Sequence, residues 1–267
     1  MKFSILINTH NQEKYLNRAI MSCLNQDFKD YEIIVCDTSD KKNPIKINKL
    51  AFKKKFKYFH LMSKYKQPEQ NQMSKILFGL KKSKGDFICL MDGDDFFNKK
   101  KLFKLNELTR KKNIFFNQDN PALIKNNSII SKKIKKKLYK NNFLFNVLIN
   151  DWPQIYGTSS ILIKRKILEK FFKTSKPFRW KYLAIDAQLA IFCKINFKIK
   201  DYFENITKKN IHVKSLGNEY LNILNKNFWL RRSMQHKYCA FIKKENIINI
   251  DFIFTNIISY FLKNYKT

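Results

Sequence analysis

The sequence predicts an α/β protein built on a parallel β-sheet. In the first 95 residues, short apolar runs that are typical of buried strands alternate with segments whose apolar residues follow helical spacing. This alternation is the pattern of a parallel sheet joined by right-handed helical crossovers. A polar residue or cluster follows each of three apolar runs, at the end of the strand where such sheets bind ligands. With 267 residues, of which 44% are hydrophobic, the chain can bury a core of its own.

The first half of the chain supplies most of the predicted sheet. A strand is expected over 3–7, followed by a polar turn at 8–11 from which Asn11 would cap a helix with Glu13 in its first turn. Helical spacing predicts that helix from Leu16, Ala19, Ile20, Cys23 and Leu24. The next predicted elements are a strand at 32–36 that ends at Asp37, a lysine-rich helix at 45–56, a strand at 58–61, a helix at 70–82 and a strand at 87–91.

The second half is less regular. No element is assigned within 112–150, which is rich in Asn and Lys. A strand is then expected over 161–163, with helices over 165–172 and 184–194, the last with Asp186 in its first turn. Beyond residue 226, two amphipathic helices are predicted. Their apolar positions are Leu230, Met234, Tyr238, Phe241 and Ile242 in the first helix, and Ile250, Ile253, Phe254, Ile257, Ile258 and Phe261 in the second.

The formal net charge of +33 does not by itself indicate a nucleic-acid partner. Of the 54 basic residues only six are Arg, whose fork matches guanine, and the other 48 are Lys. The charge is also uneven, because residues 41–66 hold ten Lys and no acid whereas residues 1–40 hold four basic and six acidic side chains. A solvated lysine face that attracts anionic ligands or lipids fits this pattern better, and no nucleic acid is expected as a partner.

The positions of the cysteines and glycines exclude several further classes of protein. The five cysteines show no close pair at zinc or redox spacing, which indicates core residues in a reducing, cytoplasmic compartment. The longest uncharged apolar stretch near the C-terminus, 252–262, would span about 16 Å as a helix, about half of a bilayer core, so no membrane crossing is expected. The five glycines form neither a G-x-G-x-x-G nor a Walker A loop, which argues against dinucleotide oxidoreductases and P-loop NTPases.

Three carboxylates, Asp92, Asp94 and Asp95, follow the predicted strand at 87–91. Carboxylates this close repel one another unless a cation or solvent compensates their charge. Oxygen ligands of this kind suit Mg²⁺ or Mn²⁺, held by one or two carboxylates together with substrate phosphates. The alternative interpretation is an acidic turn that caps the following helix. Because the cluster follows a buried strand, at the same sheet edge as Asp37, the sequence favours the metal site.

The order of these segments resembles that of family 2 glycosyltransferases with the GT-A fold. Residues 3–95 look like the nucleotide-sugar half of that family. The resemblance is carried, in chain order, by Asn8-Thr9-His10-Asn11, Leu24-Asn25-Gln26, Asp37, Gly85-Asp86-Phe87-Ile88 and the Asp-x-Asp-Asp cluster at 92–95. It continues less tightly to about residue 218 through Gly157-Thr158-Ser159-Ser160, Ile185-Asp186-Ala187-Gln188-Leu189 and Ile211-His212.

The resemblance implies a GT-A sheet that binds a nucleotide sugar, flanked by helices, in a domain at 1–218. The nucleotide-sugar half would be 1–97 and the acceptor half 98–218, with 219–267 as a C-terminal amphipathic helical extension. The implied roles are nucleotide binding for Thr9, Asn11, Asp37 and Asp92, a Mn²⁺ or Mg²⁺ ion on Asp94, Asp95 and His212, acceptor contact for Gly157, Thr158 and Ser159, and the general base for Asp186.

The activity implied by the resemblance is metal-dependent transfer of a sugar, with inversion, from a nucleotide-diphosphate sugar to a hydroxyl of a glycan or lipid-linked acceptor, in the synthesis of surface polysaccharide or glycolipid. Two departures from the family pattern keep alternatives open: Thr38 stands for an aspartate, and Ile185 and Gln188 replace two acids beside Asp186. The alternatives are a noncatalytic sugar- or lipid-binding relative and a nucleotidyltransferase. Residues 226–267 would serve as core packing, as a homodimer contact or as a peripheral contact with the inner face of the membrane.

Overall fold

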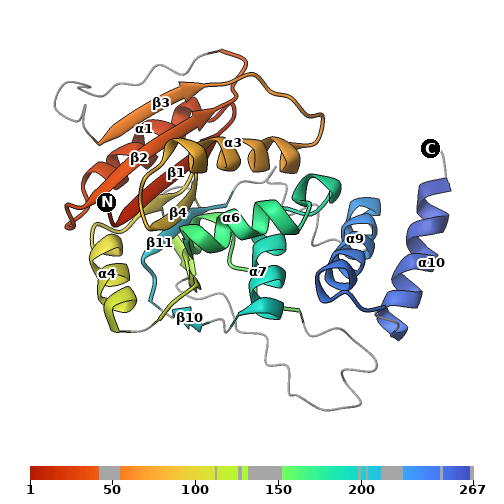
Figure 1. The fold of residues 1–267 in the computed structure, drawn as a ribbon. Coiled ribbons are helices and arrows are strands. Elements are labelled where there is room, and N and C mark those ends of the chain that lie inside the picture. The colour runs from red at the N-terminus through yellow and green to blue at the C-terminus, as the bar shows by residue number, and fades with distance from the viewer. Residues whose placement is uncertain are drawn as a thin grey trace.

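Seven strands form the main sheet, and helices cover both of its faces (Figure 1). The computed structural model describes residues 1–41, 55–111, 113–125, 128–131, 152–197, 200–202, 204–211, 225–246 and 249–264. The predicted α/β class is therefore confirmed.

The first strands are parallel and mostly apolar. β1 (Phe3–Thr9) lies between β2 (Tyr31–Asp37) and β4 (Phe87–Asp92), and every residue of β1 and β2 is buried. β3 (Phe56–His60) extends the sheet beyond β2, also in parallel. Because helices cover both faces of this sheet, its strands have continuous apolar runs rather than alternating patterns.

β9 (Ile161–Lys164) departs from the predicted parallel arrangement. It lies between β4 and β6 (Phe116–Asp119) and is antiparallel to both. β10 (Lys200–Tyr202) completes the strand order β10-β6-β9-β4-β1-β2-β3. The direction of β9 was not predicted because a short apolar run carries no signal for strand direction.

A second, four-stranded sheet has the order β5-β11-β7-β8. Its strands are β5 (Phe96–Phe97), β7 (Ala122–Lys125), β8 (Ser128–Ser131) and β11 (Thr207–Asn210). β6, β7 and β8 all fall in the stretch 112–150, to which the sequence assigned no element. These strands are four residues long and carry many polar side chains, so pairing across the chain rather than local pattern decides them.

Two apolar layers hold the helices on the main sheet. α1 (Glu13–Leu24) and α4 (Lys101–Lys111) pack on one face. α3 (Pro68–Lys82), α6 (Arg165–Thr174) and α7 (Ile185–Asn196) pack on the other face. Short 3₁₀ turns lie at Thr158–Ser160 (η1) and Pro177–Arg179 (η2). The helices predicted near 70–82, 165–172 and 184–194 are confirmed.

Two local predictions differ from the structure. The last two residues of the predicted helix at 45–56 are not helical, because Lys55 lies in a turn and Phe56 begins β3. The rest of that segment lies outside the described residues. Asn11 does not cap α1, because the cap position is Gln12 and no side chain caps the helix. Asn11 instead adopts a positive φ of 51°, a left-handed conformation that asparagine tolerates better than most residues.

Both predicted C-terminal helices are present, as α9 (Lys226–Lys243) and α10 (Ile250–Asn264). α9 packs against α7, and α10 packs against α9 on the outside of the molecule (Figure 1). Among the described residues, no helix combines the length and apolarity needed to cross a membrane.

All five cysteines are free and buried, as predicted. Burial raises the pKa values of Cys36 and Cys89 to about 12, which keeps these thiols neutral near pH 7. They therefore act as small core residues of the sheet rather than as nucleophiles.

Candidate active site

The carboxyl ends of β1, β2 and β4 bring three polar segments to one edge of the sheet, as the sequence predicted. Thr9 lies opposite Asp37 in the β1–β2 register, and Asn8 lies opposite Asp92 in the β1–β4 register. Asn8 Nδ2 also donates to Asp92 Oδ1 at 3.0 Å and to the Met91 carbonyl at 2.8 Å. These bonds tie the end of β1 to the acidic turn at 92–95.

Asp37 is fully buried, and protein donors occupy both of its carboxylate oxygens. Ser39 donates to Oδ1 from its backbone N at 2.8 Å and from Oγ at 2.5 Å, and the Tyr58 hydroxyl donates to Oδ2 at 2.6 Å. Ser39 Oγ accepts from the Asn11 backbone N at 2.7 Å, and Asn11 Nδ2 donates to Asp40 Oδ2 at 2.9 Å. Asp37 therefore fixes the loop after β2 and, through it, the turn after β1.

Lys75 of α3 lies buried beneath the same edge, and the sequence analysis missed it. Its Nζ donates to the Thr9 carbonyl at 2.8 Å and to Thr38 Oγ1 at 3.1 Å. Burial lowers the pKa of Lys75 to about 8, although the nearby charges of Asp92 and Asp37 act to raise it. A cation is thus held between the two chain segments that bear Thr9 and Thr38.

Gln72, one helical turn before Lys75, connects the acidic turn to the segment 157–159. Its Nε2 donates to Asp92 Oδ1 at 2.8 Å and to Thr158 Oγ1 at 3.3 Å. Gln72, Lys75 and Gly79 follow helical spacing on one face of α3, and a Cβ on Gly79 would lie 3.3 Å from a side chain of β1. The sequence carries no signal that singles out these two among the many polar residues of α3.

Gly93 allows the acidic turn to close against the end of β1. Its backbone N donates to the Asn8 carbonyl at 2.9 Å. A Cβ at this position would lie 2.5 Å from Thr9 Oγ1, closer than any real side chain approaches. Only glycine therefore fits between Asp92 and Asp94 in this turn.

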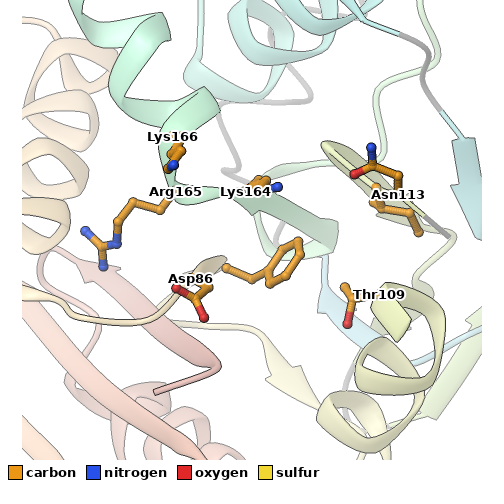
Figure 2. Close-up of a pocket in the computed structure, with 8 residues that line it drawn as sticks. Asp86, Thr109, Asn113, Lys164, Arg165 and Lys166 are labelled. Atoms are coloured by element: carbon orange, nitrogen blue, oxygen red, sulfur yellow. The ribbon is translucent and has the colours of Figure 1, made fainter. Parts of the chain in front are cut away.

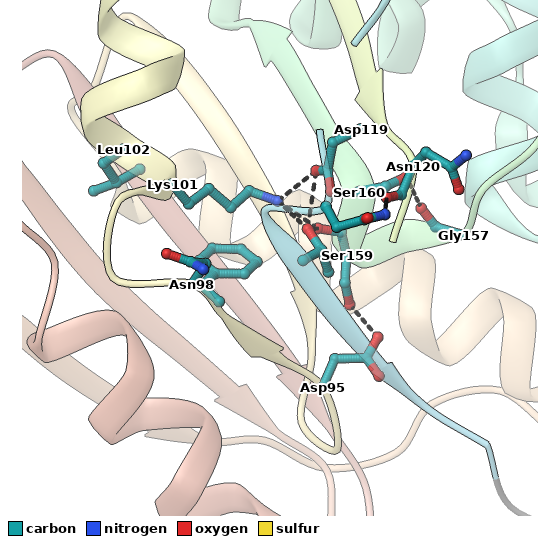
Figure 3. A network of polar contacts seen from close by, with 12 residues as sticks. Asp95, Asn98, Lys101, Leu102, Asp119, Asn120, Gly157, Ser159 and Ser160 are labelled. Carbon is teal, nitrogen blue, oxygen red and sulfur yellow. Dashed lines mark hydrogen bonds and ion pairs between the residues drawn. The ribbon is translucent and has the colours of Figure 1, made fainter. Parts of the chain in front are cut away.

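Asp95 is buried and is held by two distant segments of the chain, of which Figure 3 shows the one that contains Ser159. Ser159 Oγ donates to Asp95 Oδ2 at 2.6 Å, and the Asn210 backbone N donates to Oδ1 at 2.9 Å. The same Ser159 Oγ accepts from the Asp92 backbone N at 2.9 Å. The segment 157–159, which was predicted to face the acceptor, thus packs directly on the acidic turn.

A buried ion pair contacts the backbone carbonyl of Ser159 (Figure 3). Lys101 Nζ lies 2.8 Å from Asp119 Oδ1 and donates to the Ser159 carbonyl at 2.9 Å, and both charged side chains are 1% exposed. The Thr207 hydroxyl donates to Asp119 at 2.9 Å, and Lys101 Nζ lies 4.0 Å from the centre of the Phe97 ring. The sequence analysis missed this network because its members are far apart in the chain.

Negative charge is in excess at the acidic turn. Burial, and then the Asp94 carboxylate, raise the pKa of Asp92 to about 6. The pKa of Asp95 is raised for the same two reasons. Lys209 of β11 lies near enough to lower both pKa values, whereas Asp186 acts to raise that of Asp92. Lys209 was not predicted as a site residue.

Asp186 lies in the first turn of α7, where its Oδ1 accepts from the Ala187 backbone N at 2.7 Å. That bond alone would suit a plain helix N-terminal carboxylate. Asp186 also acts to raise the pKa of Asp92, as the smallest of the effects on that carboxyl.

Gly157 lies beside Lys209. The glycine has a positive φ of 102°, and a Cβ there would lie 2.6 Å from Lys209 Nζ. His212, the third residue predicted to hold metal, lies outside the described residues. Asn210, two residues earlier, donates its backbone N to Asp95.

A family model for glycosyl transferase family 2 matches residues 4–172, more than half of the chain. The chain belongs to glycosyl transferase family 2. The matched segment includes β1, the acidic turn and the segment 157–159, whereas Asp186 lies beyond it.

Similar curated proteins are bacterial glycosyltransferases. The UDP-Glc:alpha-D-GlcNAc-diphosphoundecaprenol beta-1,3-glucosyltransferase WfgD of Escherichia coli is 28% identical over 181 residues, which cover 66% of this chain and 64% of that enzyme. The GalNAc(5)-diNAcBac-PP-undecaprenol beta-1,3-glucosyltransferase of Campylobacter jejuni is 39% identical over 97 residues, which cover 35% and 30% of the two chains. The match therefore spans less than two thirds of either relative.

Similar solved structures confirm the predicted GT-A fold of this family 2 chain. Staphylococcus aureus TarS 1–349 in complex with UDP has a TM-score of 0.63 at 16% identity, with 99% of this chain and 71% of that chain covered. The mannosyltransferase PcManGT from Pyrobaculum calidifontis, in complex with GDP-Man and Mn²⁺, has a TM-score of 0.59 at 11% identity, with 97% and 69% covered.

The acidic turn of the family 2 chain fits a hard divalent cation by the chemistry of its donors. Asp92, Asp94 and Asp95 supply carboxylate oxygens in a place where negative charge exceeds positive charge. In the part of the chain that the structure describes, no three His, Cys, Asp or Glu side chains already surround one metal position. Mg²⁺ and Mn²⁺ commonly take only one or two carboxylates and complete their shell with phosphate and water oxygens.

A pocket of about 470 Å³ lies at the opposite, amino end of β4 (Figure 2). It is lined by Asp86, Phe87, Thr109, Asn113, Ile114, Lys164, Arg165 and Lys166, and by none of the predicted site residues. The Arg165 guanidinium donates to the Gly85 and Leu80 carbonyls and to Ser83 Oγ, so it braces the fold. This hollow is therefore separate from the acidic turn.

Proposed function

We propose that the family 2 chain transfers a sugar from a nucleotide-diphosphate sugar to a hydroxyl of a lipid-linked or glycan acceptor, with inversion. One observation carries the proposal. The acidic turn at 92–95 lies at the sheet edge that bears Thr9 and Asp37, where Asn8 of β1 donates to the Asp92 carboxylate.

The nucleotide would bind at the ends of β1 and β2. Thr9, Asn11 and Asp92 would line this site, and Asp37 would shape it by fixing Ser39 and Tyr58. Relatives are consistent with a nucleotide donor, since structures of TarS hold UDP or UDP-GlcNAc and that of PcManGT holds GDP-Man.

The diphosphate would lie over the acidic turn. Asp94 and Asp95, with His212, would hold Mn²⁺ or Mg²⁺, which neutralises charge on a leaving diphosphate when bound. Lys209 supplies a second positive charge from β11, beside Gly157. Ser159, which accepts from the Asp92 backbone N and donates to the Asp95 carboxylate, would fix the Asp95 side chain against the backbone of the turn.

The acceptor would enter beside the segment 157–159, opposite the leaving diphosphate. Asp186 would take the proton of the acceptor hydroxyl as its oxygen forms a bond to the anomeric carbon and the bond from that carbon to the diphosphate oxygen breaks. A single displacement inverts the anomeric configuration, and no protein nucleophile is needed. The WfgD and Campylobacter relatives are named as acting on diphosphoundecaprenol-linked sugars, which supports a lipid-linked acceptor.

A noncatalytic sugar-binding relative is the second candidate. The observation that favours it is Gln188, at a position where the family resemblance implies an acid. Gln188 is fully buried and donates from Nε2 to the Leu183 carbonyl at 2.8 Å, so it stabilises the fold and does not reach a substrate. This candidate predicts donor binding without turnover.

The organisation of the chain follows from the same proposal. Residues 1–97 would hold the donor, 98–218 the acceptor, and 219–267 would form a helical extension. A cytoplasmic location is supported by the five reduced, buried cysteines. A second copy of the chain and a membrane surface are the two partners that the sequence suggests for 226–267.

The direct test measures release of nucleoside diphosphate from UDP-Glc, UDP-GlcNAc and GDP-Man, with Mn²⁺ and a soluble lipid-diphosphate GlcNAc acceptor. Asp186→Asn should lower kcat by about 10³-fold and leave donor affinity unchanged, because a general base contributes about 10²–10⁴-fold. Asp27→Asn, an exposed carboxylate elsewhere, is the matched control. Normal turnover by Asp186→Asn would remove Asp186 as the base, and donor binding by the wild type without turnover on any acceptor would establish the noncatalytic candidate.

A further inference from the structure

The C-terminal helix α10 contacts α9 through polar side chains and through the rings of Phe252 and Phe254, which pack on His236 and Trp229. It nevertheless exposes large apolar side chains on its outer face. Thr255 and Ser259 are buried against α9. Six large apolar or aromatic side chains of this helix are between 48% and 65% exposed, namely Ile250, Ile253, Phe254, Ile257, Tyr260 and Phe261. A surface helix of a globular protein normally has the opposite arrangement.

Specific polar contacts hold α10 in this orientation. Arg232 of α9 donates to both oxygens of Asp251, from Nε at 2.9 Å and from Nη2 at 2.8 Å. Ser233 Oγ donates to Asn256 Oδ1 at 2.7 Å, and Ser259 Oγ donates to the Trp229 carbonyl at 2.9 Å. Rotating α10 to bury its apolar face would break all of these bonds, so the exposed face is a built feature of the fold.

The pair of helices that bears this face is basic. Lys226, Lys237, Lys243 and Lys244 of α9 and its C-terminal end are exposed. Residues 226–267 contain eight basic residues and only two acids, Glu245 and Asp251, and Asp251 is engaged by Arg232. A broad apolar face together with exposed lysines is the pattern of a helix that lies in the interface of an anionic bilayer.

We infer that the outer face of α10, with the lysines of α9, docks the protein on a membrane surface that contains anionic lipid. A second copy of the chain is a poorer partner. A twofold interface would place this face against itself, and with it the same lysines, in a protein whose net charge is already +33. An anionic lipid surface instead complements both the apolar side chains and the cations.

The docking face is joined to the acceptor side of the site. The Tyr238 hydroxyl of α9 donates to the Gln188 carbonyl of α7 at 3.1 Å, and the Tyr238 and Trp180 rings pack edge to face at 5.3 Å. Gln188 lies two residues from Asp186 on the same helix. Docking through α10 would therefore hold Asp186 at a fixed height above the lipid, and this step, unlike docking itself, rests on the proposed function.

The test is co-sedimentation of the full chain with vesicles of phosphatidylcholine containing 30% phosphatidylglycerol, and with vesicles of phosphatidylcholine alone. The variant Ile253→Ser/Phe254→Ser/Ile257→Ser removes three side chains of the face. Its matched control, Phe103→Ser/Ile129→Ser/Ile130→Ser, removes one Phe and two Ile that are similarly exposed on α4 and β8. The α10 variant should lower the partition coefficient on anionic vesicles by about 100-fold, since each side chain loses its burial in lipid, and the control should leave it unchanged.

Three results would overturn the inference. The first is equal partitioning of the α10 variant and the wild type, and the second is no binding of the wild type to anionic vesicles. The third is a dimeric wild type in light scattering that the α10 variant converts to a monomer, which would assign the face to a second copy. Turnover of a soluble acceptor without vesicles should be the same in the α10 variant and the wild type, so loss of docking and failure of the proposed transfer are separate outcomes.

Discussion

Asp92 at the sheet edge and Asp251 between α9 and α10 are both partly buried carboxylates. They differ in the charges that surround them. Burial and the neighbouring Asp94 raise the pKa of Asp92 to about 6. Burial also acts to raise the pKa of Asp251, but contacts with His236 and Arg232 outweigh it and lower the pKa to about 2. An excess of negative charge favours the binding of a cation, whereas matched charge is typical of a structural contact. The sheet edge and the C-terminal helices therefore use buried acids for different purposes.

The buried pair of Lys101 and Asp119 is the intermediate case, with one cation facing one carboxylate. Burial still raises the pKa of Asp119, although Lys101 acts to lower it. Lys101→Met should destabilise the fold by about 3 kcal/mol, because it leaves a buried carboxylate unpaired. Urea unfolding measures this. The double variant Lys101→Met/Asp119→Leu should recover more than half of the loss, and an equally unstable double variant would show that the charge balance is not the cause.

Lys209 acts to lower the pKa values of both Asp92 and Asp95 in the acidic turn. Lys209→Met should weaken binding of a nucleotide-diphosphate sugar about 10-fold, the size of one charge-assisted contact. Lys208→Met is the matched control, because adjacent residues of β11 point to opposite faces and Lys208 Nζ lies over the Phe96 ring at 5.4 Å. Calorimetric titration of the donor distinguishes the two variants. Equal weakening by both would indicate general surface charge rather than a specific contact.

We expect the smallest effect from Asp251, whose pKa is lowered in the folded protein, whereas that of Asp92 is raised. Its folded pKa of about 2 lies below the value near 3.9 expected in the unfolded chain, so its contribution is present above pH 4 and is lost as the pH falls through 2. Because the side chain is only partly shielded, we expect about 1 kcal/mol. The stability difference between wild type and Asp251→Asn should shrink from pH 5 to pH 2.5 in urea titrations. A constant difference across that range would contradict the assignment.

The sequence predicts the half of the site that lies on strand ends. β1, β2 and β4 are continuous apolar runs, and their polar ends at Thr9, Asp37 and Asp92 could be placed on one edge without knowing any contact. The sequence also indicates that Gly93 shapes a turn. Only the structure shows that a Cβ at this position would collide with Thr9.

The second half of the site could not be predicted because its members meet only through the fold. Gln72 and Lys75 are single polar residues in an amphipathic helix, and Lys101 pairs with Asp119 across two elements. Helical spacing also predicts an apolar face on α10, but spacing cannot tell whether that face points inward or outward. The polar contacts of Arg232 and Ser233 decide it.

We propose that the acidic turn binds a nucleotide diphosphate together with a divalent cation. The most direct measurement is the thermal shift of the wild type and of Asp94→Ala/Asp95→Ala with UDP and GDP, each with and without Mn²⁺. We predict stabilisation of the wild type by one nucleotide only when Mn²⁺ is present, about 2.7 kcal/mol at 100 times the dissociation constant, and none in the double variant. Equal stabilisation of the double variant, or no response of the folded wild type to either nucleotide, would contradict the claim.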